Sequence, residues 1–413
     1  MKPLPLICLA LPLLAVFSVA ASHGAVAQPI TLTHEAVLAN DGDPWAMVAA
    51  GSDSSTIVAG ASGYGGWAAK FDAKGQTVWD YKIGLQDEYK YPIPEAQFRG
   101  AAAMPDGSVF LCGFMPRPQG STAASLMLVH LDASGRPLSE AYLAPDSRTN
   151  PGMQARGAAA CVRSGDAVVV WAEAWRVIRS AGVRPRTENF HWVFAVDSAG
   201  QTKWETLIPI LLGNGISAGP VILEAVGPGL IFSVSNNEQT ELMTMGEGGA
   251  VKSHRKIPGR FVPVRPLAVG GTIQLYGTLD NDVKPVVVTL DHQLAEVSRV
   301  SGDYPSDFWV SFAFSTPGGS IALFGSTIHG GGAAYTTFVV SADRALKAGQ
   351  TLELPHARRP VQDTGFIRAA ARGGRAGEFV VARRILPVAP DNLPAAAPPK
   401  AILQLELDYL RLK

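Results

Sequence analysis

The amino-acid sequence predicts an all-β protein, a seven-bladed β-propeller built from four-stranded antiparallel blades. Two repeated phrases carry this prediction. One is an apolar strand, an Asp-x-x-Gly turn and a second strand; the other is a small-residue strand, a turn and a β-rich strand. The composition agrees, because 43 Gly and 30 Pro with 47% hydrophobic residues are too rich in turn formers for a helical protein and too apolar for a disordered one.

The first phrase is clearest between Trp67 and Trp79, which read WAAKFDAKGQTVW around Asp72. Copies return at Asp132 and Asp197. Weaker copies are centred on Gly246, Asp291, Asp343 and Asp408. Asp caps the backbone of a turn and Gly adopts positive φ without strain, so each copy predicts a hairpin.

The second phrase precedes each copy of the first, as in Ala101–Leu111 (AAAMPDGSVFL) and Ala158–Val170 (AAACVRSGDAVVV). The two phrases together give four short strands in about 55 residues, the size of one propeller blade. A β-helix needs shorter repeats, a helical solenoid needs a 3.6-residue period, and a β-sandwich would not repeat one phrase seven times. Of the repeat architectures considered, a closed ring of seven blades is the one that agrees with the sequence.

The last blade is one strand short, because little chain follows Asp408. The segment Ile30–Val37 precedes the first inner strand and alternates apolar and polar residues at its start. We expect this segment to supply the missing outer strand and to close the ring, which removes the open sheet edges that invite aggregation.

The segments Ala69–Trp79 and Pro105–Gly113 resemble the repeats of secreted bacterial β-propeller proteins of the SBBP type. They are also similar to the quinoprotein-like repeats of outer-membrane assembly lipoproteins. The likeness covers nearly the whole chain after its N-terminal segment; it is good in blades 1 to 3 and degenerate in blades 4 to 7. Asp72 and Trp79 resemble the quinoprotein docking motif, and only blades 1 and 3 keep the Trp. The resemblance implies a propeller fold and an envelope location; these families have no single activity, so it implies no reaction.

The N-terminus is typical of an export signal. Lys2 supplies a positive charge, Leu4–Ala21 is almost entirely apolar, and Ala25–Ala27 fits an A-x-A cleavage site. We expect cleavage after Ala27, a single propeller domain over residues 28–413, and a periplasmic or secreted protein, rather than an uncleaved membrane anchor. No later stretch is apolar enough to span a membrane, so no transmembrane segment is expected after cleavage.

Charge and cysteine content narrow the function classes. The chain has 35 basic and 35 acidic residues, and this balance disfavours nucleic acid as a partner. Cys112 and Cys161 are the cysteines of the expected mature chain, too few for a disulfide framework. We expect these two to stay unbridged, because the predicted strands place them toward opposite faces. A monomer without a cofactor or a metal is expected.

Long connections on one face of the predicted ring, here called the long-loop face, are the natural place for a ligand site, because loops vary on a rigid scaffold. They span 84–97, 173–188, 355–365 and 386–400. The inner strands begin at that face, and counting back from each turn glycine places Arg and Trp residues there. The candidate ligand-binding residues at this channel mouth are Trp45, Arg99, Arg156, Arg265, Trp309 and Arg368.

Arg presents a planar donor fork for carboxylate or phosphate, and Trp offers a face for a sugar or a cation. The alternative is that neighbouring acidic residues pair with these arginines and plug the channel. A second set of arginines is a candidate for docking an acidic partner, the alternative being a solvated surface. It consists of Arg176, Arg179, Arg184, Arg186, Arg383 and Arg384.

Signals for catalysis are weak. Gly215–Gly219 matches the G-x-S-x-G pattern but lacks a strand–turn–helix context. No catalytic residue is therefore predicted. The hypothesis is a non-enzymatic binding or scaffold propeller that contacts a protein or glycan of the cell envelope. The alternatives are a hydrolase or lyase acting on a polyanionic substrate at the channel mouth, or an immunity protein against an exported toxin.

Overall fold

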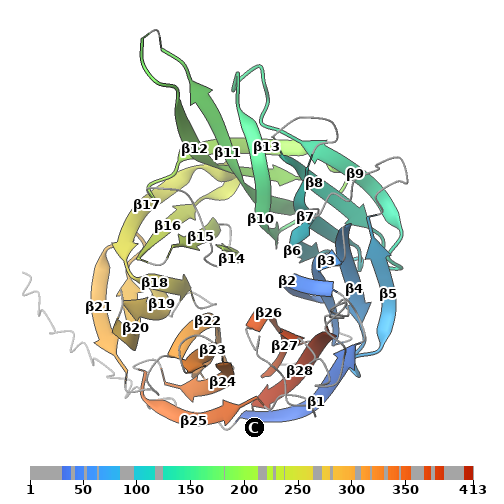
Figure 1. Ribbon diagram of the computed structural model, residues 1–413, viewed down its shortest axis with the longest axis vertical. Coiled ribbons are helices and arrows are strands. Elements are labelled where there is room, and N and C mark those ends of the chain that lie inside the picture. The colour runs from blue at the N-terminus through green and yellow to red at the C-terminus, as the bar shows by residue number, and fades with distance from the viewer. Residues whose placement is uncertain are drawn as a thin grey trace, which may run out of the picture.

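The computed structural model is a ring of seven four-stranded antiparallel sheets, as the sequence predicts (Figure 1). It describes residues 30–38, 42–50, 54–62, 65–83, 97–116, 124–180, 182–212, 221–226, 229–236, 238–263, 272–279, 282–302, 308–316, 319–329, 334–343, 346–354, 367–373, 377–385 and 404–412. The expected signal peptide and the Gly215–Gly219 pattern lie outside these residues. Within them, no helix has the length and apolar character needed to cross a membrane.

Blades 1 to 4 follow one another along the chain, each running from the inner strand outward. Blade 1 is β2 (Gly42–Ala50), β3 (Ser55–Ser62), β4 (Gly65–Phe71) and β5 (Thr77–Lys82), and blade 2 is β6 (Gln97–Ala103), β7 (Val109–Pro116), β8 (Ala124–Leu131) and β9 (Pro137–Leu143). Blade 3 is β10 (Gln154–Ser164), β11 (Ala167–Ile178), β12 (Arg186–Val196) and β13 (Thr202–Pro209). Blade 4 is β14 (Val221–Val226), β15 (Gly229–Ser235), β16 (Gln239–Met245), the 3-10 turn η1 (Glu247–Gly249) and β17 (Val251–Pro258).

Blades 5 to 7 complete the ring. Blade 5 is β18 (Arg260–Pro263), β19 (Ile273–Leu279), β20 (Asp282–Leu290) and β21 (Glu296–Ser301), and blade 6 is β22 (Phe308–Ser315), β23 (Ile321–His329), β24 (Ala334–Ala342) and β25 (Ala348–Glu353). Blade 7 joins both ends of the chain in the order β26 (Ile367–Arg372), β27 (Glu378–Ile385), β28 (Gln404–Leu412) and β1 (Ile30–Leu38). The core lies between blades, where apolar side chains of adjacent sheets pack face to face.

The N-terminal strand closes the last blade, which confirms the prediction from the sequence. β1 pairs antiparallel with β28 from Ile30, opposite Leu412, to Leu38, opposite Leu405. The Thr33 hydroxyl adds a hydrogen bond of 2.9 Å to the Tyr409 carbonyl. Backbone pairing across the two ends of the chain therefore holds the ring shut.

Turn chemistry explains why the blades repeat. At Asp72, Oδ1 accepts hydrogen bonds from the amides of Lys74 and Gln76, both at 2.8 Å, and Asp132, Asp197 and Asp291 cap their turns in the same way. In blades 5 and 6 the turn glycine is replaced by Leu294 and Leu346, which adopt φ of 62° and 61°. Both side chains are buried, and burying a leucine offsets the cost of the left-handed backbone, about 1–2 kcal/mol.

The copy assigned to Asp408 is wrong as a turn. Asp408 lies within β28, and its carboxylate is buried 2.7 Å from Nε of Arg383 in β27. The Arg383 guanidinium also donates to the Leu354 carbonyl. The residue type matched the repeat, but β28 continues past it as the third strand of blade 7.

The Trp residues retained in blades 1 and 3 pack on the turn glycine of the next blade. A Cβ on Gly135 would lie 2.7 Å from the Trp79 ring, and one on Gly249 would lie 2.4 Å from the Trp204 ring. Both glycines have left-handed φ, +83° and +82°. The Trp of one blade thus needs a neighbouring turn without a side chain.

Gly135→Ala is therefore expected to lower the free energy of unfolding by clearly more than Gly200→Ala. Both positions have left-handed φ, +83° and +79°, and share the backbone cost of about 1–2 kcal/mol, but a Cβ on Gly200 meets nothing within 4 Å. Urea unfolding of the two variants isolates the Trp79 contact. Equal losses of stability would show that this contact contributes nothing.

The two cysteines are free and buried, as expected, but the geometric reason given for it is wrong. A Cβ on Gly100 would lie 2.5 Å from Cys112 Sγ and 2.5 Å from the Cys161 amide nitrogen, so the two residues meet between blades 2 and 3. Both lie within their strands rather than at opposite ends. Burial, with the hydrogen bond to Cys161, raises the pKa of the Cys112 thiol.

Candidate binding site on the long-loop face

The innermost strands β2, β6, β10, β14, β18, β22 and β26 surround the centre of the ring (Figure 1). The predicted channel-mouth residues are distributed over five of these strands: Trp45 lies in β2, Arg99 in β6, Arg156 in β10, Trp309 in β22 and Arg368 in β26. Arg265 lies outside the described residues. Side-chain positions are described for Arg99 and Trp309, so the six residues are not seen as one assembled site.

Arg99 is held by its own blade. Its Nε donates to Gln97 Oε1 at 3.1 Å, and its guanidinium carbon lies 5.3 Å from the centroid of the Phe114 ring. Gln97 begins β6 and Phe114 is near the end of β7, so this cluster sits where the inner strand starts, on the long-loop face. Arg99 therefore already has a polar partner and an aromatic one.

Trp309 has a partner that the sequence prediction missed. The guanidinium carbon of Arg260 lies 5.2 Å from the centroid of the Trp309 ring, within cation–π range. Arg260 is the first residue of β18 and Trp309 the second of β22, so neighbouring inner strands bring them together where both begin. The backward count from Gly270 lands next to Arg260, at Phe261 or Val262, and this was the signal that could have found it.

The second predicted feature, the arginine-rich connection, is a β-hairpin that extends beyond the ring. β11 has 12 residues and β12 has 11, and their far ends project outward at the top of Figure 1. β10 pairs with β11 only as far as Trp175, and β13 pairs with β12 only as far as Phe190. Beyond these points, Arg176, Val177 and Ile178 pair with Glu188, Thr187 and Arg186.

The arginines of this extension fall into two groups. Arg176 and Arg186 both bind Glu188, with nitrogen–oxygen distances of 3.0 and 2.9 Å, and Arg176 also covers the Phe190 ring. Arg179 and Arg184 are exposed near the turn and make no ion pair with a described residue. Val177 and Val183 beside them are 42% and 67% exposed.

The remaining predicted docking residues lie elsewhere. Arg383 is buried in β27 against Asp408, so the prediction that it docks a partner is wrong. Its guanidinium forms an ion pair with the Asp408 carboxylate inside blade 7. Arg384 follows it within the same strand rather than on a loop. Successive side chains of a strand point to opposite faces, and two adjacent arginines in the sequence do not reveal which of them faces the interior.

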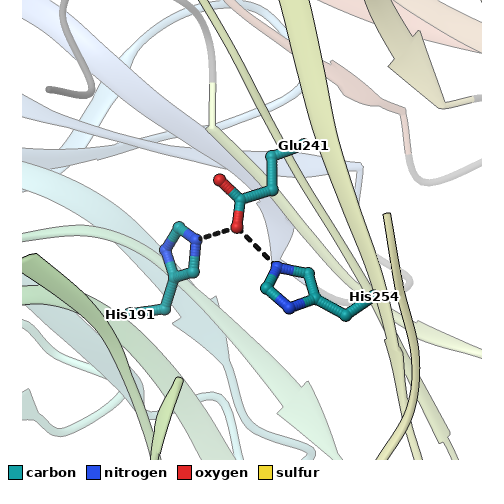
Figure 2. Close-up of side chains that lie close together, drawn as sticks. All are labelled: His191, Glu241 and His254. Atoms are coloured by element: carbon teal, nitrogen blue, oxygen red, sulfur yellow. Dashed lines mark hydrogen bonds and ion pairs between the residues drawn. The ribbon is translucent and has the colours of Figure 1, made fainter. Parts of the chain in front are cut away.

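A polar network joins the base of the hairpin to blade 4 (Figure 2). Glu241 of β16 accepts hydrogen bonds at Oε1 from His191 Nε2 at 2.7 Å and from His254 Nε2 at 2.5 Å. Its Oε2 accepts two more, from the amides of Leu211 and Leu212, both at 3.1 Å. His191 and Glu241 are fully buried, and His254 is partly exposed on β17.

Glu241 remains ionised in this environment. Burial opposes the charge, but hydrogen bonds from His191 and His254 outweigh it and lower the pKa of the carboxyl from 4.5 to about 2. The four donors account for the lone pairs of both carboxylate oxygens, as a buried charge requires. The network therefore stabilises a fixed negative charge between blades 3 and 4.

The hydrogen-bond directions fit a network better than a metal centre. The two His nitrogens and a Glu oxygen lie within 4.8 Å of one another, a spacing that a metal ion could bridge. However, Trp171 Nε1 donates to His191 Nδ1 at 3.0 Å, so the neutral ring carries its proton on Nε2 and has no lone pair there for a metal. Metal-bound histidines instead donate their second nitrogen to an acceptor.

No protein-family model and no curated protein sequence matches the chain. Solved structures resemble it at low identity. The Dos1 propeller is 11% identical, with a TM-score of 0.49, and the match covers 92% of this chain and 82% of the Dos1 chain. YCF48 bound to a D1 peptide is 12% identical, with a TM-score of 0.48, and the match covers 91% of this chain and 94% of the YCF48 chain. A protein of unknown function from Bacteroides caccae is 14% identical, with a TM-score of 0.41, and the match covers 72% of this chain and 93% of that protein.

Proposed function

We propose that this chain is a non-enzymatic binding propeller, exported to the bacterial envelope, whose long-loop face holds an acidic protein partner through the β11–β12 hairpin. The observation that carries the proposal is the hairpin extension beyond residues 175 and 189. There the strands pair with each other and with no third described strand. A two-stranded ribbon by itself is marginal in water, so a partner strand or surface would complete it.

Charge and exposure indicate the kind of partner. Glu188 is shared by Arg176 and Arg186, so the extension has an excess of positive charge, with Arg179 and Arg184 left for other carboxylates. Exposed Val177 and Val183 add apolar contact area, which suits a protein surface better than a purely ionic polymer. A ribbon with open edges can also accept an extended peptide as an added strand.

The network at the hairpin base supports the same role. Trp171 of β11 and His191 of β12 belong to the two hairpin strands, and the Trp171–His191–Glu241 chain ties both to blade 4. Trp171 also stacks on Phe232 of β15 with a centroid distance of 5.2 Å. A docking element needs such a rigid base, because an ordered base reduces the conformational entropy lost on binding.

Charge reversal of the hairpin tip is expected to remove binding to an acidic chain. Poly-L-glutamate is the probe, measured by biolayer interferometry at low salt. Arg179→Glu with Arg184→Glu should weaken binding about tenfold, since two attractions become two repulsions at exposed sites. The melting temperature should stay unchanged, because the tip lies outside the interblade core.

The matched control is Arg136→Glu with Arg163→Glu, two exposed arginines at the tight turns of blades 2 and 3 on the opposite face. These changes add the same charge and should reduce binding only slightly. Equal losses in both pairs would contradict the proposed surface and leave only net charge as the cause. Preference for heparin over poly-L-glutamate would contradict a protein partner and favour a sulfated glycan.

A further inference from the structure

Arg260 begins the inner strand β18 and forms no ion pair with a described acidic residue. Its Nε is buried and has no hydrogen-bond partner in the part of the chain that the structure describes. Burial is the cause that lowers the pKa of the guanidinium, and no acidic group among the described residues raises it. Arg99, near the start of the inner strand β6, donates to Gln97, and buried Arg383 is paired with Asp408. Arg260 thus differs from these two arginines, whose guanidinium groups have hydrogen-bond acceptors.

Trp309 fixes the orientation of this charge. The guanidinium carbon lies over the Trp309 ring, 5.2 Å from its centroid, so an aromatic surface covers one side of the cation. The residues next to Arg260, Phe261 and Val262, are buried, which fixes the backbone that carries it.

An unpaired, partly buried cation is unfavourable for stability, because burial removes its hydration without supplying a partner. Such a residue persists where it performs a function, and pre-organised charge is typical of ligand sites. The N–H donors of a guanidinium match the oxygens of a carboxylate or phosphate group. Both residues begin inner strands at the long-loop face, which places the fork at the channel mouth.

We propose that Arg260, stacked on Trp309, forms an oxyanion-binding site at the channel mouth that takes a carboxylate or phosphoryl group of a small ligand. This site is separate from the β11–β12 hairpin and does not depend on the function proposed for it. The sequence prediction placed Trp309 in such a site; the structure adds Arg260 as the cation.

The test compares wild-type protein with Arg260→Met by thermal unfolding and isothermal titration calorimetry. The probes are glucuronate, acetate and inorganic phosphate at matched ionic strength, with methyl glucoside as the neutral control. Wild type should gain about 2–4 °C in melting temperature at saturating oxyanion and nothing from methyl glucoside. Tighter binding of glucuronate than of phosphate would identify a carboxylate ligand. Tighter binding of phosphate would identify a phosphoryl ligand.

Arg260→Met should have two opposite effects. Its melting temperature without ligand should be equal to or above that of wild type, because the unpaired charge is removed and the alkyl stem still packs on Trp309. Its affinity for the oxyanion should fall at least tenfold. A purely structural arginine would instead give a lower melting temperature and an unchanged response to anions, and that result would overturn the proposal.

Two further variants keep the test decisive. Arg260→Lys retains the charge without the fork and should keep only a minor part of the affinity, whereas full affinity would show that any cation suffices and would contradict the fork. Arg163→Gln, an exposed arginine at a tight turn, should leave the response to oxyanions unchanged. The hairpin pair Arg179→Glu and Arg184→Glu should also leave it unchanged, so failure here and failure of the hairpin proposal are separable.

Discussion

Removal of residues 28–39 is expected to open the ring and to lower the melting temperature by at least about 10 °C, with aggregation on heating. The deletion takes away β1, which pairs with β28 along its whole length and donates the Thr31 and Thr33 hydroxyls to the carbonyls of Arg411 and Tyr409. It would expose the outer edge of β28 and uncover the apolar contact made by Leu32. Differential scanning calorimetry and light scattering measure both effects.

The matched control removes a segment of similar length outside the ring. Replacing residues 177–187 by a Gly-Gly turn shortens the β11–β12 hairpin but leaves every four-stranded blade intact. Its melting temperature should stay within a few degrees of the wild-type value. A peptide of residues 28–39 added to the truncated protein should restore part of the lost stability. A truncated protein that melts like wild type and stays monomeric would show that β1 is not needed for closure.

Glu241→Gln is expected to lower the free energy of unfolding by about 3 kcal/mol, since buried donors lose their charged acceptor and are left unsatisfied. The Gln amide would place an NH₂ group against His191 Nε2–H or against the amides of Leu211 and Leu212, so donor would face donor. His191 cannot change tautomer freely, because Trp171 donates to its Nδ1. Equilibrium unfolding in urea measures the loss.

Glu188→Gln is the control, because Glu188 pairs with two partly exposed arginines and its loss should cost less than about 1 kcal/mol. Zn²⁺ should leave the wild-type melting temperature unchanged, as expected for a network whose His191 Nε2 carries a proton. A rise in the wild-type melting temperature with Zn²⁺ that is absent in Glu241→Gln would contradict this assignment and would indicate a metal site. Equal stability losses in the two Gln variants would contradict the role of burial.

The stability difference between wild type and Glu241→Gln should depend on pH. The folded-state pKa of Glu241, about 2, lies below its ordinary value of 4.5, so the unfolded chain takes up the proton first as the pH falls. The carboxylate therefore contributes its full stabilisation above the unfolded value and loses it between about pH 4.5 and pH 2. A difference that stays constant over this interval would mean that the charge of Glu241 is not the stabilising feature.

Local chemistry explains why the fold could be read from the sequence. The Asp-x-x-Gly turns at Asp72, Asp132 and Asp197 use contacts within five residues, so their pattern survives in a linear sequence. The small-residue strand that is followed by a turn and a β-rich strand recurs in every blade and so yields the number of blades, and the alternation at the start of Ile30–Val37 predicts the closing strand. The error at Asp408 has the same origin, because the pattern alone cannot tell a turn Asp from a buried one.

The site depended on contacts that no local pattern encodes. Arg260 and Trp309 belong to different blades, as do His191 and Glu241, and each pair is brought together only when neighbouring sheets pack. Whether an arginine is exposed, like Arg179, or buried, like Arg383, depends on which face of a strand it occupies and what covers that face. The sequence by itself determined the repeat, the blade number and the ring closure, since turn and strand preferences act over a few residues. Only the tertiary structure decided which charges are paired, because ion pairs and aromatic contacts form between blades.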